Sequence, residues 1–178
     1  MFDLGPAAHE MTRLVEGVRD EQLEAPTPCT DWVLRDLLAH VHMFTTVFTC
    51  NARKAEIPRP DGLPRSWRTT IPEGLDELAT AWREESAWQG RVSAGGVDMT
   101  GEQNALVAVE ELVVHGWDVA RASGQAFHVE DDLLGRVEEF QELFVARLPT
   151  GHGPYGPAVP VAEDAPRLTR ILGTAGRA

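Results

Sequence analysis

Apolar residues recur at helical spacing along most of this 178-residue chain, and proline-containing segments separate the stretches in which they do so. Because a helix brings residues three and four positions apart onto one face, this pattern predicts amphipathic helices that share a core. We find no convincing strand pattern. The predicted helices cover residues 4–19, 31–54, 102–123 and 130–148, with another that begins near Pro72 and a short one over 166–172.

Residues with known preferences at helix ends support some of these limits. Thr30 is a good N-cap for the second helix, and Asp31 would place a negative charge in its first turn. Pro72 suits the first position of the third helix, and Gly124 suits the position just after the fourth. The sequence therefore predicts an all-α fold, an antiparallel four-helix bundle with an irregular proline-rich C-terminal tail and a short terminal helix, as one domain over residues 1–178.

The charge balance excludes several classes of partner. The chain carries 28 acidic and 16 basic residues, a net charge of −12, which disfavours binding to nucleic acid and to anionic membranes. It has neither an apolar run of the roughly 20 residues that a membrane helix needs nor a signal peptide, so we expect a cytoplasmic protein. Its two cysteines are expected to be reduced thiols.

Three potential metal ligands stand out. Glu111 and His115 are four residues apart, so both project from one face of the fourth helix. His40 takes the place of a hydrophobe on the apolar stripe of the second helix. Two histidines and a carboxylate can bind a divalent cation and leave a coordination position open for chemistry. The spacing alone also allows a hydrogen-bonded core histidine and a surface Glu111–His115 pair, because ExxxH motifs are common in helices.

Three further residues could assist such a site. Asp118 follows His115 by three residues and Asp36 precedes His40 by four, so either carboxylate could orient an imidazole; a salt bridge or a solvated carboxylate is the alternative. Cys29 precedes the second helix, whose positive end would favour a reactive thiolate, although an ordinary loop cysteine is the simpler reading.

The segments PTPCTDWVLRDLLAH and ELVVHGWDVARASG together resemble the mycothiol-dependent maleylpyruvate isomerase N-terminal family, within the DinB-like superfamily of metal-binding four-helix bundles. The closing segment is similar to an actinobacterial branch of that family. The resemblance implies a divalent metal, zinc or nickel, bound by His40, Glu111 and His115. The family's isomerase has an additional C-terminal domain, whereas this chain ends about fifty residues after the fourth helix, so the metal site carries over better than the named reaction.

We therefore expect a metal-dependent transferase or isomerase in which a low-molecular-weight thiol, mycothiol, attacks a small electrophile as the thiolate. Three alternatives remain open at this point: a hydrolase that uses metal-bound water, a bundle that binds a metal or small ligand without turnover, and a structural bundle without metal. A homodimer is compatible with such a bundle. The sequence does not identify the substrate.

Overall fold

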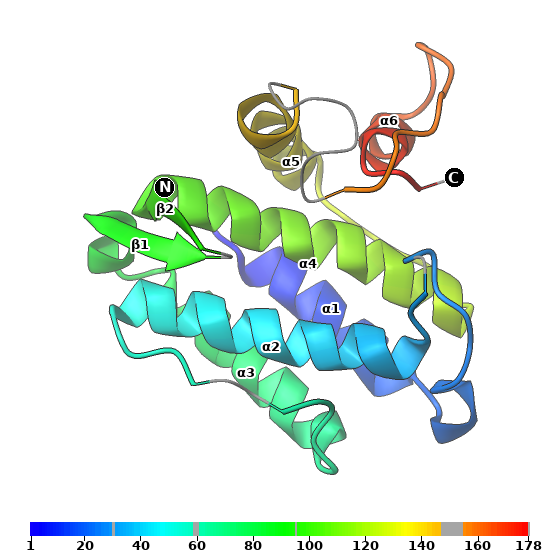
Figure 1. Ribbon diagram of the computed structural model, residues 1–178, viewed down its shortest axis with the longest axis horizontal. Coiled ribbons are helices and arrows are strands. Elements are labelled where there is room, and N and C mark those ends of the chain that lie inside the picture. The colour runs from blue at the N-terminus through cyan, green and yellow to red at the C-terminus, as the bar shows by residue number, and fades with distance from the viewer. Residues whose placement is uncertain (30, 59–60, 95, 147–154, 178) are drawn as a thin grey trace.

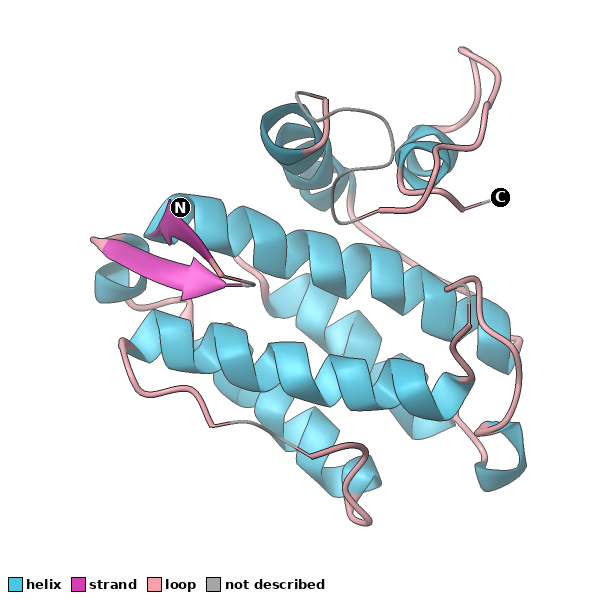
Figure 2. Ribbon diagram, in the orientation of Figure 1, coloured by secondary structure: helices cyan, strands magenta, loops and turns pink. Residues whose placement is uncertain are grey.

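The computed structural model of the protein describes residues 1–29, 31–58, 61–94, 96–146 and 155–177. Over these ranges the chain is mostly helical, with one small two-stranded sheet (Figures 1 and 2). The elements in chain order are α1 (Gly5–Gly17), η1 (Asp20–Gln22), α2 (Leu34–Arg53), α3 (Trp67–Ala81), η2 (Glu85–Trp88), β1 (Arg91–Ala94), β2 (Val97–Thr100), α4 (Gly101–Ser123), α5 (Asp131–Phe144) and α6 (Arg167–Thr174).

The first four α-helices pack around a shared core. Helices α1 and α2 each contact both α3 and α4, α5 packs on α4, and α6 packs on α5. In the view of Figure 1, α5 and α6 lie above α4, whereas α2 and α3 lie below it. Among the described residues, no helix is both long and apolar enough to cross a bilayer. The arrangement leaves α2 and α4 as neighbours, and these are the two helices that carry the predicted ligands.

Apolar residues at helical spacing contribute to the core. Leu37, Phe44 and Phe48 of α2 are buried, as are Leu75 and Leu78 of α3. Each such side chain contributes roughly 1.5–3 kcal/mol when it is transferred from water to the interior. The same rows of residues therefore stabilise the helices and fix which faces of α2 and α4 remain available for polar side chains.

Helix α4 has strong signals at both ends. The Thr100 hydroxyl accepts the amide of Gln103 at 3.2 Å, and the Gln103 side chain accepts the amide of Thr100 at 3.0 Å. This reciprocal capping satisfies two amides that the helix itself leaves free. Gly124 follows the last helical residue with a left-handed backbone (φ 72°), which confirms the predicted stop. The helix that carries Glu111 and His115 is thus fixed at both ends.

Two predicted helix starts were wrong. Helix α3 begins at Trp67, five residues before Pro72, so this proline lies inside the helix. Trp67 and Ile71 are both buried, and their burial offsets the hydrogen bond that Pro72 cannot donate. Helix α2 begins at Leu34, and its first-turn acidic residue is Asp36, not Asp31, which has a left-handed backbone (φ 68°).

The start of α2 is set by the preceding loop. The amide of Leu34 donates to the carbonyl of Ala25 and that of Arg35 to the carbonyl of Leu23, both at 2.9 Å. These bonds satisfy amides that an N-cap side chain would otherwise serve. The predicted cap at Thr30 and the tail residues 147–154 lie outside the described residues.

The all-α prediction missed the small sheet. Strands β1 and β2 form an antiparallel hairpin in which Arg91 pairs with Thr100 and Val92 with Met99. The turn includes Gly96 with φ 81°, a conformation that favours glycine. Each strand has only four residues, too few for a clear alternating pattern. The hairpin leads directly into α4 and lies at one end of the helices (Figure 2).

Candidate metal site

The structure brings the three predicted ligands together. Nε2 of His40 lies 2.9 Å from Oε2 of Glu111, and Nε2 of His115 lies 3.2 Å from the same oxygen. Each of the three residues offers one ligand atom, and these three atoms all lie within 4.8 Å of one another. Two ligands of a tetrahedral zinc ion, each about 2.0–2.1 Å from it, are about 3.3 Å apart. The spacing of these donors is therefore compatible with a shared divalent cation.

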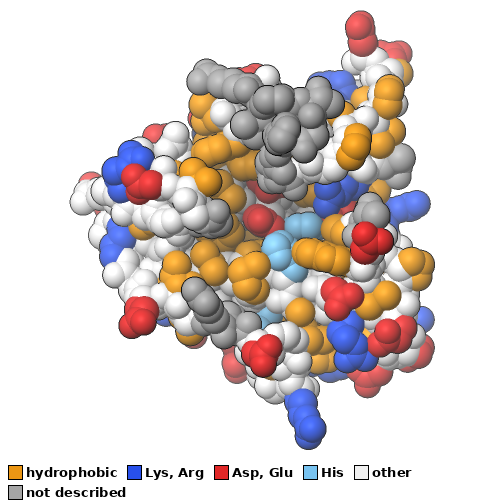
Figure 3. Space-filling model, in the orientation of Figure 1, with side chains coloured by type: hydrophobic (Ala, Val, Ile, Leu, Met, Phe, Trp, Pro, Cys, Tyr) orange, Lys and Arg blue, Asp and Glu red, His pale blue; other side chains and the backbone are white. Residues whose placement is uncertain are grey.

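The site is open to solvent on one side. The side chains of His40, His115 and Glu111 retain 19%, 13% and 21% of their exposure. Figure 3 shows histidine and acidic side chains together in a hollow near the centre of one face, flanked by hydrophobic side chains. A cation bound there could thus be reached by a small molecule.

Aromatic rings surround the histidines. The Trp32 ring lies 5.1 Å from that of His40 and 6.3 Å from that of His115, measured between centroids. Phe44 lies on another side, 5.5 Å from His40 and 6.4 Å from His115. Trp32 itself is 36% exposed, so it borders the hollow instead of packing in the core. These rings limit how the imidazoles can rotate.

Asp118, one of the two carboxylates that could orient an imidazole, contacts His115. Its Oδ2 lies 2.9 Å from Nδ1 of His115. The other nitrogen of that ring, Nε2, faces Glu111. A neutral histidine whose Nδ1–H donates a hydrogen bond to a carboxylate presents its Nε2 lone pair, which is the tautomer that a metal needs.

The structure places Asp36 elsewhere. Its carboxylate accepts the backbone amide of Val33 at 3.2 Å, at the N-terminus of α2. A carboxylate there stabilises the helix through its free amides and the helix dipole. Asp36 therefore has a local role in starting the helix that carries His40.

Cys29 lies beside the site for a different reason from the one predicted. It is five residues before α2 begins, so the end of that helix does not act on it. Its Sγ instead lies 3.1 Å from Oδ2 of Asp118 and 3.8 Å from Nδ1 of His115. Sequence spacing could not show this contact, which depends on how the loop before α2 folds over α4.

Arg177 is a site residue that sequence reasoning missed. Its Nη2 lies 2.8 Å from Oδ2 of Asp118 and 3.4 Å from Sγ of Cys29. Cys29, His115 and Asp118 also form a compact group of potential ligands. The guanidinium already supplies positive charge there, so the cation site that the donors favour is the one formed by His40, Glu111 and His115.

Glu110 was also missed. It is buried, and its Oε1 accepts a hydrogen bond from the Tyr155 hydroxyl at 2.8 Å. Burial and the nearby charge of Glu111 raise the pKa of Glu110 to about 8. Its position four residues after buried Leu106 and three before buried Val113 was a signal, because that row of α4 faces the interior.

The charges within the site stabilise one another. Burial works to raise the pKa of Glu111, but hydrogen bonds to His115 and His40 outweigh it and hold that pKa well below the usual range. Burial likewise disfavours a charged His115, yet its bonds to Asp118, Cys29 and Glu111 keep the pKa of this imidazole well above its usual value. The groups around His115 therefore favour the protonated form of its ring.

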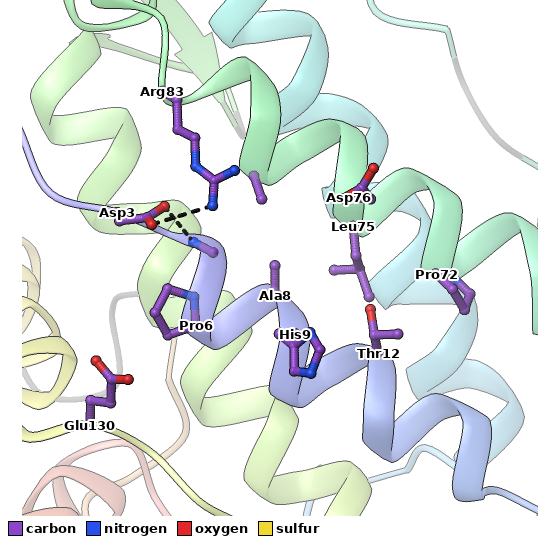
Figure 4. Close-up of a pocket in the computed structure, with 12 residues that line it drawn as sticks. Asp3, Pro6, Ala8, His9, Thr12, Pro72, Leu75, Asp76, Arg83 and Glu130 are labelled. Carbon is purple, nitrogen blue, oxygen red and sulfur yellow. Dashed lines mark hydrogen bonds and ion pairs between the residues drawn. The ribbon is translucent and has the colours of Figure 1, made fainter.

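A separate groove of about 590 Å³ lies elsewhere on the molecule, between α1 and α3, and includes Asp3, His9 and Arg83 (Figure 4). Its ion pair joins Arg83 to Asp3 at 3.4 Å, and both side chains are largely exposed. The convergent donors and the shifted pKa values belong to the histidine–glutamate group, which is therefore the candidate functional site.

These features define a helical protein in which two neighbouring helices present a two-histidine, one-carboxylate group. The profile of the mycothiol maleylpyruvate isomerase N-terminal domain family matches residues 4–120, and the chain belongs to this family. The chain is 31% identical over 155 residues to uncharacterized proteins from two strains of Mycobacterium tuberculosis. Each match covers 86% of this chain and 80% of the relative.

Two crystal structures of the mycothiol-dependent maleylpyruvate isomerase have a similar fold. One is a histidine-to-alanine mutant, with a TM-score of 0.58 and 16% identity; the other has a TM-score of 0.55 and 17% identity. Each match covers 74% of this chain but only 63% of the isomerase chain. At this identity the likeness shows the fold, and that fold agrees with the family assignment.

Proposed function

We propose that this protein is a mycothiol-dependent enzyme, an isomerase or transferase, whose divalent cation is bound by His40, Glu111 and His115. The observation that carries the proposal is the convergence of one atom from each of these residues in a solvent-accessible hollow. Imidazole and carboxylate ligands suit zinc first and nickel second. Family membership supports mycothiol as the thiol, because the family's name and that of its isomerase include mycothiol. We also interpret α1–α4 as the predicted four-helix bundle.

Each residue has a distinct task in this proposal. His40 and Glu111 would hold the cation from neighbouring helices, and His115 would complete the set with Nε2 while its Nδ1–H donates to Asp118. A divalent cation held there would stabilise a thiolate. Trp32 lies against His40 and would hold its imidazole in place. The mycothiol thiolate would then be the nucleophile towards a small electrophile.

Metal content tests the ligand assignment. We expect elemental analysis of the wild type, purified without added metal, to find about one divalent ion per chain, and Glu111→Ala to lose it. Glu110→Gln is a matched control, because this neighbouring carboxyl side chain faces Tyr155 and not the histidines. Equal metal content in wild type and Glu111→Ala would contradict the assignment.

The reaction needs a separate test. Zinc-loaded protein, mycothiol and a panel of small electrophiles, maleylpyruvate included, should give adduct or isomer faster than buffer does. The rate should require both thiol and metal, which also separates this chemistry from hydrolysis by water. A metal-loaded protein that accelerates no reaction in the panel would leave a binding protein without turnover.

A further inference from the structure

The C-terminal end of the chain reaches the candidate metal site. Arg177 follows α6 and is only 10% exposed. Its Nε lies 3.2 Å from Oδ1 of Asp118 and its Nη2 lies 2.8 Å from Oδ2, so the guanidinium bonds to both carboxylate oxygens. A two-point contact of this kind fixes the plane of a carboxylate as well as its position.

The same carboxylate orients a proposed metal ligand. Oδ2 of Asp118 accepts from Arg177, from the Cys29 thiol at 3.1 Å and from Nδ1 of His115 at 2.9 Å. Asp118 has no solvent exposure, so these donors compensate its charge in place of water. A shift of this carboxylate would rotate the His115 ring, whose Nε2 lies 3.2 Å from Glu111.

We propose that Arg177 is a positioning residue of the metal site and acts through Asp118 on His115. The C-terminal segment, residues 155–177, is therefore part of that site. The inference rests on the proposed metal function. It extends beyond the family match, which ends at residue 120. A second contact joins the same segment to α4, because the Tyr155 hydroxyl bonds to the buried Glu110. The segment is thus attached to α4 on both sides of α6.

A double-mutant cycle measures whether Arg177 acts through Asp118. The Zn²⁺ dissociation constant of the full chain is determined by competition with a chelator for wild type, Arg177→Ala, Asp118→Ala and the double variant. Loss of a group that orients a ligand weakens metal binding about 10- to 100-fold. We expect Asp118→Ala to fall in that range, Arg177→Ala to lose about 3- to 10-fold, and the double variant to bind no worse than Asp118→Ala. Multiplied losses in the double variant would overturn the proposal.

Cobalt spectra separate positioning from a general loss of structure. In Co²⁺-loaded protein, the visible absorption should change in Arg177→Ala and move back towards wild type in Arg177→Lys, which restores the charge but not the two-point contact. Arg170→Ala is the matched control, since Arg170 lies on α6, is 44% exposed and faces Glu138 at 3.9 Å. Its spectrum should remain that of the wild type. An unchanged spectrum and Zn²⁺ affinity in Arg177→Ala would refute the inference, whereas a wild type that binds neither ion would refute the proposed function itself.

Discussion

His115 connects the two halves of the site through its two ring nitrogens. Nε2 faces the Glu111 oxygen that His40 also contacts, and Nδ1 faces Asp118. Without a cation both sides of the ring face carboxylates, which favours the imidazolium. Binding of the proposed cation would remove the Nε2 proton, while the Nδ1 proton would stay on His115 and donate to Asp118. The proposed metal binding would therefore be coupled to proton release at this one residue.

This coupling predicts how zinc binding depends on pH. The pKa of His115 in the metal-free fold is held well above its usual value by its bonds to Asp118, Cys29 and Glu111, despite burial. The raised pKa favours a proton on Nε2 that zinc would have to displace, so affinity should rise by up to about 10-fold per pH unit between pH 6 and 8. Calorimetry in buffers of different ionisation enthalpy should show about one proton released per ion. An affinity that is constant over this range would contradict the prediction.

Glu110 predicts a second pH effect, on the stability of the fold. Burial and the charge of Glu111 raise its pKa to about 8, so the folded state binds this proton more tightly than the unfolded chain does. Its contribution to stability is present below the unfolded pKa of about 4.3 and is lost as the pH rises to about 8. In Glu110→Gln, which keeps an oxygen for Tyr155 but cannot ionise, we expect this loss to be absent.

Thermal unfolding in chelator at pH 5 to 8 tests this prediction. The Tm of Glu110→Gln should fall less over this range than that of the wild type, by on the order of 5 °C. Glu163→Gln is the control, because Glu163 is exposed in the loop before α6. Parallel pH profiles for wild type and Glu110→Gln would show that Glu110 does not titrate in this range.

The residues of the site differ in how far the sequence could predict them. The grouping of His40, Glu111 and His115 was predicted because helical spacing, an interrupted apolar stripe and a family resemblance all lie in local segments of the sequence. Arg177 was missed because it lies 59 residues from Asp118, and no periodic pattern connects them. Contacts made by loops and chain ends depend on the packing of whole elements, so they leave no mark on local spacing.

At the scale of elements, the start of α4 is fixed by a close contact. A Cβ on Gly101 would lie 2.6 Å from the carbonyl oxygen of Ala87 and from backbone atoms of Trp88. Because backbone cannot move aside as a flexible side chain can, we expect Gly101→Ala to lower the free energy of unfolding by about 1–3 kcal/mol. A Cβ on Gly156 has no atom within 4 Å, so Gly156→Ala should be nearly neutral. Chemical denaturation measures both, and equal stabilities would contradict the prediction.

The elements were predicted well where burial and end signals agree. Helix α4 combines an apolar row, a capping pair and a terminal glycine, and its observed range differs from the prediction by one residue at its start. Helix α3 extends past Pro72 because burial of Trp67 and Ile71 outweighs a local preference. The hairpin was missed because tertiary contacts, such as that of buried Met99 with Asn104, stabilise strands too short to show a pattern.

At the scale of the whole molecule, the proposed cation would join α2 to α4. His40 and Glu111 are 71 residues apart in the chain and adjacent in the fold. The unfolded chain does not hold these donors together, so a cation that binds the folded state stabilises it by about 2.7 kcal/mol at 100 times its dissociation constant. For a chain of this size that corresponds to a rise in Tm of about 5–10 °C.

Two histidines of α2 offer a matched comparison for this prediction. His40 faces Glu111, whereas His42 lines the groove between α2 and α3 with Thr70 and Glu73. We expect His40→Ala to lose most of the zinc-dependent rise in Tm and His42→Ala to retain it, as measured by thermal unfolding with zinc and with chelator. If zinc raises the Tm of both variants equally, the ion binds elsewhere and does not join α2 to α4.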